Sequence, residues 1–147
     1  MRINEKEIKE RIANDDINWI VRNITSKIDF PLDKESTPLH YASCFLAYKC
    51  VKYFIELGYD VNEQDDCTYP LNYLICNSSC MTDELEECIR MLFEYGAKVN
   101  IRDKECNETP FLCVENQIDD AEQQSKYLNL LYEMVNTYNL NMENNMY

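Results

Sequence analysis

The stretch Thr37-Pro38-Leu39-His40-Tyr41-Ala42 decides the fold, because it is a helix start that recurs along the chain. Thr at the N-cap and Pro at the first helical position together open a helix. The pattern returns as Tyr69-Pro70-Leu71-Asn72-Tyr73-Leu74 and as Thr109-Pro110-Phe111-Leu112. The prolines of these stretches lie 32 and then 40 residues apart, so the 147 residues are predicted to form an array of similar units.

A second motif alternates with the first. Gly58-Tyr59-Asp60-Val61-Asn62 recurs as Gly96-Ala97-Lys98-Val99-Asn100, and these stretches contain both glycines of the chain. Each follows an amphipathic helical pattern, and Gly ends a helix readily because it adopts a positive φ without a Cβ clash. Each complete unit is therefore predicted to hold two helices, the first opened by Thr-Pro and the second ended by Gly.

Together the two motifs resemble ankyrin repeats, through TPLHYA at 37–42, LGYDVN at 57–62 and YGAKVN at 95–100. The resemblance implies an all-α solenoid of stacked helix-turn-helix units joined by short hairpin loops. It also implies a single ankyrin-repeat domain over residues 1–147. The units are predicted at about 2–32, 33–64, 65–102 and 103–142, followed by a short C-terminal tail.

The chain departs from the family pattern at several turns. The family usually has Gly two residues before Thr-Pro, where this chain has Glu35, Cys67 and Asn107. Phe45-Leu46 replaces the usual Asn-Gly between paired helices. The third unit carries extra residues, which we expect in a surface loop around 77–83. These changes leave the helices intact and predict less regular turns.

The composition is strongly acidic. Asp and Glu outnumber Lys and Arg by 27 to 14, which gives a net charge of −13 and a pI near 4.4. The net charge runs from 0 through −2 and −4 in the first three units to −7 for residues 103–147. This balance argues against nucleic-acid binding and against docking on anionic membranes. No stretch is apolar enough for a membrane span or a signal peptide, so we expect a location in the cytoplasm of the producing or host cell.

Cysteine is frequent, and its chemistry depends on the compartment. For a cytoplasmic protein we expect reduced thiols. Structural zinc is the weaker alternative, because the chain has no C-x-x-C pattern and His40 is its only histidine. The eight cysteines are Cys44, Cys50, Cys67, Cys76, Cys80, Cys88, Cys106 and Cys113.

His40 is the residue that first suggests catalysis. Ser43 and Cys44 lie three and four positions later and share its helix face, but no third residue is placed to orient a base. The resemblance to ankyrin repeats implies instead that His40 hydrogen-bonds backbone near the turn between units. No phosphate-binding loop, dinucleotide fingerprint or metalloprotease motif occurs. We expect no enzymatic activity, no cofactor, no metal and no small-molecule substrate.

Ankyrin domains bind partners through their hairpin tips and through the concave face of their first helices. On this chain the resemblance gives, as tip candidates, Glu63, Gln64, Asp65, Asp66, Arg102, Asp103, Lys104 and Glu105. As concave candidates it gives Ser36, Cys44, Phe45, Thr68, Cys76, Asn77, Glu108, Asn116 and Gln117.

The leading hypothesis for function is a protein–protein interaction module that acts as an inhibitor or an adaptor. Its acidity predicts a partner protein with a basic surface. The alternatives are an immunity-type protein that neutralises a toxin, a structural subunit of a larger assembly, and a thiol-dependent enzyme built around His40 and Cys44.

Overall fold

The computed structural model describes residues 4–28 and 30–145. These described residues form eight α-helices, one short 3-10 helix and no β-strand. None of these helices combines the length and the apolar character that crossing a bilayer requires. The helices are α1 (Glu5–Ala13), α2 (Ile17–Asn23), α3 (Pro38–Cys44), α4 (Tyr48–Leu57), α5 (Pro70–Asn77), α6 (Asp83–Glu94), α7 (Pro110–Gln117) and α8 (Ala121–Tyr138), with the 3-10 helix η1 (Asp33–Glu35).

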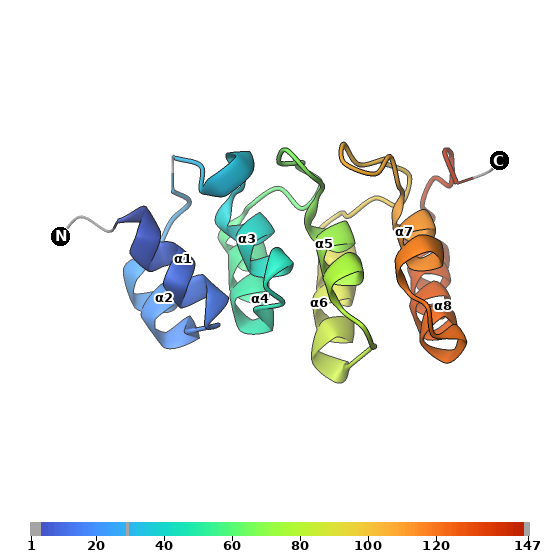
Figure 1. Ribbon diagram of the computed structural model, residues 1–147, viewed down its shortest axis with the longest axis horizontal. Coiled ribbons are helices and arrows are strands. Elements are labelled where there is room, and N and C mark those ends of the chain that lie inside the picture. The colour runs from blue at the N-terminus through green and yellow to red at the C-terminus, as the bar shows by residue number, and fades with distance from the viewer. Residues whose placement is uncertain (1–3, 29, 146–147) are drawn as a thin grey trace.

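The helices stack in antiparallel pairs (Figure 1). The first helices α1, α3, α5 and α7 contact one another in sequence and form one layer. The second helices α2, α4, α6 and α8 form the other layer in the same way. The connections between pairs all run along one edge, and the termini lie at opposite ends of the stack. The predicted all-α solenoid of stacked helix pairs is confirmed.

All three predicted helices begin at their proline, and the two with Thr at the N-cap position form the expected cap. The Thr37 hydroxyl accepts a hydrogen bond from the His40 N–H, and Thr109 accepts one from Leu112 N–H. Tyr69 makes no such cap, because its phenol lies in the core and donates to the carbonyl of Ile101 at 2.7 Å. In the third unit, a hydrogen bond to the following hairpin thus replaces the helix cap.

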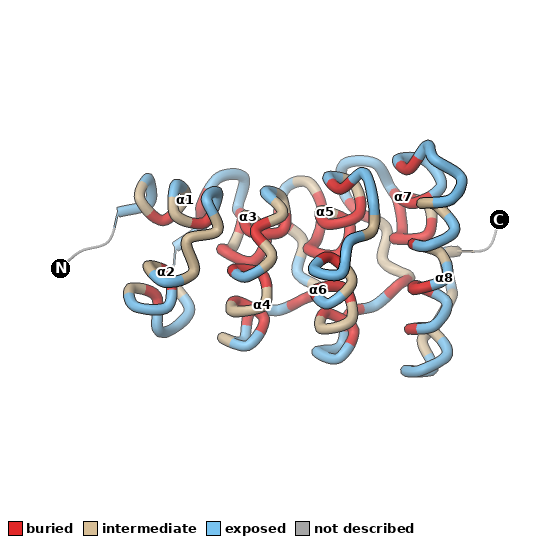
Figure 2. Tube along the Cα trace, turned by 90° about the horizontal axis from the view of Figure 1, so that it is seen from below, coloured by how far each residue is buried: buried red, intermediate tan, exposed pale blue. Residues whose placement is uncertain are grey.

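The apolar core lies between the two layers and continues through the stack (Figure 2). Leu39 and Leu71 in the first layer are completely buried, as are Phe54 and Leu92 in the second. Burial of one such side chain stabilises the fold by about 1.5–3 kcal/mol. A single pair of helices has no interior, so this burial depends on the neighbouring pairs.

The extra residues of the third unit lie between α5 and α6, where the sequence predicts them. This loop is bound by the last helix. The Ser78 and Tyr127 hydroxyls lie 2.6 Å apart, and the Met81 N–H donates to the Gln123 side chain at 2.8 Å. The inserted loop therefore bridges the third and fourth helix pairs.

Three turns that lack the glycine of the family pattern have a strained backbone. Gly58 and Gly96 end their helices with φ of 104° and 98°. Glu35 (φ 59°), Leu46 (φ 55°) and Asn107 (φ 56°) adopt the same left-handed region. Each stands where the family pattern has Gly. This region destabilises an L-residue with a Cβ by roughly 1–2 kcal/mol relative to a right-handed conformation, and Asn is destabilised least.

Replacing Glu35 by Gly is therefore expected to raise the free energy of unfolding by about 0.5–1 kcal/mol, because the strain at positive φ exceeds the entropy that Gly adds to the unfolded chain. The measurement is urea denaturation followed by circular dichroism. Glu35→Ala is the matched control: it removes the same carboxylate but keeps the Cβ. A similar gain from Glu35→Ala would contradict the explanation by backbone strain.

Candidate functional site

The first helices present the same three positions in each unit, at three, six and seven residues after the opening proline. Helical spacing places these positions on one face. They hold Tyr41, Cys44 and Phe45 on α3, Tyr73, Cys76 and Asn77 on α5, and Cys113, Asn116 and Gln117 on α7.

A groove of about 300 Å³ opens on this face between α3, α5 and the adjoining hairpin loops. Its floor and walls are aromatic and sulfur-containing, and its rim is charged. Asn77 spans it at one end, where its amide donates to the Cys44 carbonyl at 2.9 Å. The residues that line the groove are Asp33, Lys34, Ser36, His40, Tyr41, Cys44, Phe45, Cys67, Tyr73, Asn77 and Glu105.

Phe45 is the most exposed large apolar side chain of the groove, at 50%. Its ring packs against Tyr41, with centroids 4.8 Å apart. An aromatic held by a second ring but open to water has little entropy to lose on binding, and it offers a large apolar area. Phe45 therefore belongs to the surface and not to the core.

Asp65 is buried beneath the groove and organises it. Its carboxylate accepts hydrogen bonds from the hydroxyls of Ser36 and Tyr73, both at 2.6 Å, and from two backbone N–H groups. Burial by itself would raise the pKa of Asp65, but these hydrogen bonds lower the pKa below its ordinary value. Burial and the Asp65 carboxylate raise the pKa of Tyr73, so its phenol stays a donor.

A buried aspartate with the same kind of hydrogen bonds occurs in the next hairpin. Thr68 stands where Ser36 does in its own unit, and its hydroxyl donates to the buried Asp103 carboxylate at 2.8 Å. Asp103 also accepts from the backbone N–H groups of Cys106 and Glu108. Each of these two buried aspartates thus ties its hairpin to the hydroxyl of the preceding unit.

His40 has the structural role that the resemblance implies. It is 1% exposed, and its Nδ1 accepts a hydrogen bond from the Thr37 N–H at 3.0 Å. The proton is therefore on Nε2, which donates to the Glu63 carbonyl at 2.6 Å. Asn72, at the equivalent position of the next unit, donates to the Glu108 carbonyl at 3.1 Å in the same way.

The Cys44 thiol does not have the properties of a nucleophile. Burial raises its pKa, and the Asp65 carboxylate raises it further. A reactive cysteine needs the opposite, a lowered pKa beside a cation or a free base. Both nitrogens of the nearest candidate base, His40, are engaged by backbone groups.

The structure divides the predicted binding residues into two groups. Five are buried and make hydrogen bonds within the protein, which leaves them little surface for a partner: Ser36, Asp65, Thr68, Asp103 and Glu108. The others are exposed or half-buried: Cys44, Phe45, Glu63, Gln64, Asp66, Cys76, Asn77, Arg102, Lys104, Glu105, Asn116 and Gln117. Of these, the groove brings together Cys44, Phe45, Asn77 and Glu105.

Sequence reasoning missed five residues of the groove. Tyr41 and Tyr73 could have been found, because both stand three residues after the opening proline, on the same face as Cys44 and Cys76. Asp33 and Lys34 belong to η1, for which the sequence has no clear signal, and Cys67 was considered only as a turn residue. Asp33 is held by Lys9 of α1 at 3.1 Å.

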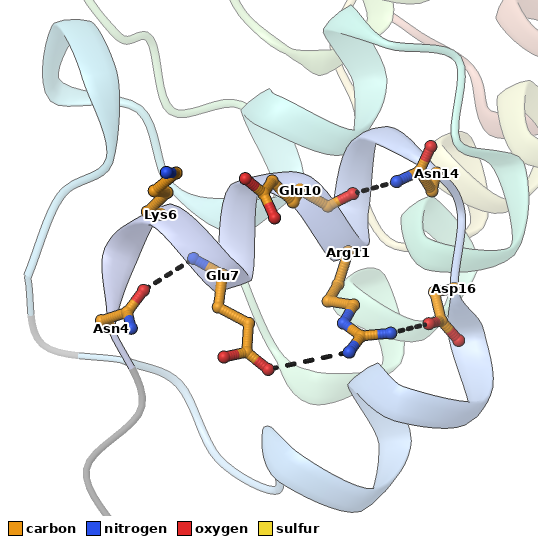
Figure 3. A pocket seen from close by; sticks show the side chains of 7 residues that line it. All are labelled: Asn4, Lys6, Glu7, Glu10, Arg11, Asn14 and Asp16. Atoms are coloured by element: carbon orange, nitrogen blue, oxygen red, sulfur yellow. Dashed lines mark hydrogen bonds and ion pairs between the residues drawn. The ribbon is translucent and has the colours of Figure 1, made fainter.

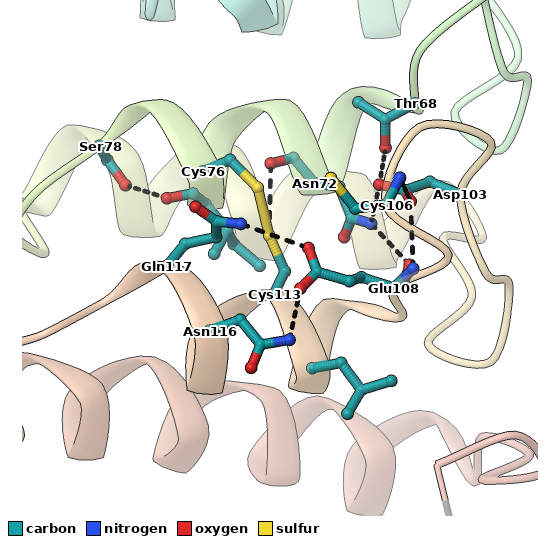
Figure 4. Close-up of a disulfide and its surroundings, with 12 residues drawn as sticks. Thr68, Asn72, Cys76, Ser78, Asp103, Cys106, Glu108, Cys113, Asn116 and Gln117 are labelled. Atoms are coloured by element: carbon teal, nitrogen blue, oxygen red, sulfur yellow. Dashed lines mark hydrogen bonds between the residues drawn. A yellow bond between two sulfur atoms is a disulfide. The ribbon is translucent and has the colours of Figure 1, made fainter.

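The expectation of reduced thiols is wrong for one pair. The structure joins Cys76 on α5 to Cys113 on α7 by a disulfide (Figure 4). The stacking of the first helices explains this pairing, since it brings the two Cα atoms to 6.5 Å, within the range of a disulfide. Their separation of 37 residues conceals it in the sequence. The other six cysteines are free.

A second hollow lies at the N-terminal end, over α1 (Figure 3). Three of its charged groups pair with one another: Arg11 lies between Glu7, at 3.8 Å, and Asp16, at 2.7 Å. Hydrogen bonds from Arg11 and from the Trp19 N–H lower the pKa of Asp16. This hollow is polar and internally paired, so the groove between α3 and α5 is the better candidate.

The family model described as ankyrin repeats (3 copies) matches residues 11–103 of the chain. The matched segment extends from α1 to the third hairpin and contains most of the groove. No curated protein matches the chain.

Replacing Asp65 by Asn is expected to lower the free energy of unfolding by about 2–3 kcal/mol, because an amide cannot accept all the hydrogen bonds of the carboxylate. A lowered pKa in the folded state stabilises the fold above about pH 4, and this contribution is lost as the pH falls through the folded pKa. Asp65→Asn should therefore show a weaker loss of stability on acidification than the unaltered protein. Urea denaturation at neutral pH and near pH 3 measures both effects. Asp66→Asn, at the exposed neighbour, is the control; equal effects of the two substitutions would contradict this role of Asp65.

Proposed function

Because the chain belongs to the ankyrin-repeat family, whose repeats are generally protein–protein interaction modules, we propose that it binds a partner protein through the groove between α3 and α5. The partner presents an apolar side chain to Phe45 and a basic surface to the acidic molecule around the groove. The protein acts as an inhibitor or an adaptor of that partner.

The observation that carries the proposal is the exposure of Phe45 beside Tyr41 in a hollow whose depth is set by buried hydrogen bonds. The polar atoms of Ser36, His40 and Tyr73 are committed to the protein itself. What remains accessible is apolar and aromatic, with charge at the edge. Such a composition is typical of the core and rim of a protein interface.

The net charge of the whole molecule, more than the charge of the groove, supports a basic partner. The groove itself carries Asp33 and Glu105 against Lys34, and Asp33 is already paired with Lys9. The net charge of the chain is −13. A field of this sign attracts a basic surface over about a Debye length of 10 Å and speeds the encounter more than it strengthens the complex.

The architecture supports an inhibitor or adaptor role. Most of residues 4–28 and 30–145 lie in the stacked helix pairs or in their connections. A rigid stack with a preformed groove changes a partner by occupying its surface. The raised pKa of Cys44 and the engaged nitrogens of His40 count against the thiol-dependent enzyme.

The test is selection of binders from a displayed library of random peptides on the immobilised protein, in parallel on its Phe45→Ala variant. The proposal expects enriched peptides with one large apolar residue flanked by Lys or Arg, and their loss on the variant. Enrichment of acidic peptides, or enrichment that is indifferent to Phe45, would contradict it.

Phe45→Ala is expected to weaken binding of an enriched peptide, or of a partner identified with it, by at least about tenfold, because it removes the accessible apolar area of the groove. Thermal unfolding should change little, since the ring is half exposed. Isothermal titration calorimetry measures the affinity. Tyr95→Ala is the matched control, as Tyr95 is 49% exposed at the end of α6 and outside the groove. Equal losses for both variants would place the contact elsewhere.

Glu105→Lys is expected to slow association with a basic partner and to reduce the dependence of the rate on salt, with a smaller effect on dissociation. Stopped-flow kinetics at low and at physiological ionic strength measure this. Glu94→Lys, on the exposed last turn of α6, changes the net charge equally but lies outside the groove. Equal slowing by both variants would assign the effect to net charge alone and contradict a local contribution of Glu105.

A further inference from the structure

Three metal-binding side chains converge between α5 and α7, outside the groove. They are Cys76 on α5, Cys113 on α7 and Glu108 in the hairpin that precedes α7. One sulfur or oxygen atom of each lies within 4.8 Å of the others. Figure 4 shows the Glu108 carboxylate directed at the sulfur pair. A disulfide needs no third group, so the carboxylate beside it requires its own explanation.

Glu108 is only 6% exposed, and a buried carboxylate needs compensation for its lost hydration. The amides of Asn116 and Gln117 donate to its two oxygens, at 2.5 and 3.5 Å. None of the ion pairs among residues 4–28 and 30–145 includes Glu108. The two amides orient the carboxylate without neutralising it. The buried Asp103, whose carboxylate accepts from the Glu108 N–H, adds to the negative potential.

We propose that Cys76, Cys113 and Glu108 form a binding site for a zinc-like divalent cation when the disulfide is reduced. A thiol or phosphine reductant supplies two electrons, and with two protons from water the S–S bond becomes two thiols. Each thiol then releases its proton to solvent as its sulfur binds the cation. The disulfide and the metal site are two states of one sulfur pair.

The donor set selects the cation. Two thiolates favour Zn²⁺ and its spectroscopic substitute Co²⁺ over Mg²⁺ and Ca²⁺, which prefer oxygen. Three protein donors leave the fourth position of a tetrahedral site to water. Cys76 is only partly buried, so solvent reaches this side. Asn116 and Gln117 hold the carboxylate as outer partners commonly hold metal ligands.

The repeat explains why the sequence conceals the site. Structural zinc ligands usually come in closely spaced pairs, whereas these cysteines are 37 residues apart. Stacking brings position six of one first helix against position three of the next. In this way the stack builds a dithiol from two cysteines in separate motifs. The inference does not rest on the proposed protein-binding function.

The test is titration of Co²⁺ into the full chain, once after reduction with a phosphine and removal of the reductant under argon, and once with the disulfide intact. The reduced protein is expected to bind one equivalent with the near-ultraviolet sulfur-to-cobalt absorption of two thiolates. The oxidised protein should lack this absorption. Zn²⁺ should displace the cobalt and bleach the signal.

Variants assign the ligands. Cys76→Ser and Cys113→Ser should each lower the affinity at least a hundredfold, and Glu108→Gln should lower it by about 10–100-fold. Cys67→Ser and Cys80→Ser, at free cysteines away from the site, are the controls and should have no effect. Circular dichroism checks that each variant is folded.

A labelling experiment on the unaltered protein tests the proposal even if a variant fails to fold. In the reduced, unaltered protein, one equivalent of Zn²⁺ should protect the partly buried Cys76 from maleimide labelling, as identified by mass spectrometry, whereas the fully buried Cys113 is not expected to be labelled in either state. The proposal is overturned if reduced protein shows no cobalt–thiolate absorption, if Glu108→Gln binds as tightly as the unaltered chain, or if zinc protects other cysteines instead.

Discussion

Lateral packing of each helix pair on its neighbours is the interaction on which the whole structure depends. A pair such as α3 and α4 has apolar side chains on two sides and no interior of its own. Leu39 and Phe54 become fully buried only because α5 and α6 cover them on one side and α1 and α2 on the other. This dependence explains why the units share one spacing of helices, and why the inserted loop after α5 is accommodated at the open end of a pair, where it reaches α8.

The hairpins are held by polar bonds that repeat in role and differ in residue. His40 donates to the Glu63 carbonyl, and Asn72 donates in the same direction to the Glu108 carbonyl. Ser36 and Thr68 supply equivalent hydroxyls to buried aspartates. Buried polar groups are costly unless paired, so these bonds align successive hairpins strictly. They also consume the polar atoms beneath the groove, which leaves aromatic surface and peripheral charge for a partner.

The sequence predicts the parts of this protein that are local. Thr-Pro at a helix start and Gly at a helix end act within a few residues, so the order of the helices from α3 to α7 and the loop after Asn77 follow from the pattern. The groove follows only partly, because exposure depends on the neighbouring unit: Asp65 and Asp103 look like solvated hairpin acids in the sequence and are buried in the fold. The disulfide could not be predicted from spacing at all, since it depends on which positions of α5 and α7 face each other.

The groove and the cluster of Cys76, Cys113 and Glu108 occupy equivalent positions in successive units. Between α3 and α5 this place holds Cys44, Tyr73 and Thr68; between α5 and α7 it holds Cys76, Cys113 and Glu108. Tyr73 is bulky and keeps the first site open as an aromatic groove, whereas the small Cys113 allows sulfur to meet sulfur. Thr68 turns to the aspartate of the next hairpin, but Glu108 accepts from the amides of its own helix and faces the sulfurs. A stack of equivalent positions can therefore carry different chemistry from one unit to the next without a change of fold, because the helix pairs stack in the same way whichever side chains stand at these positions.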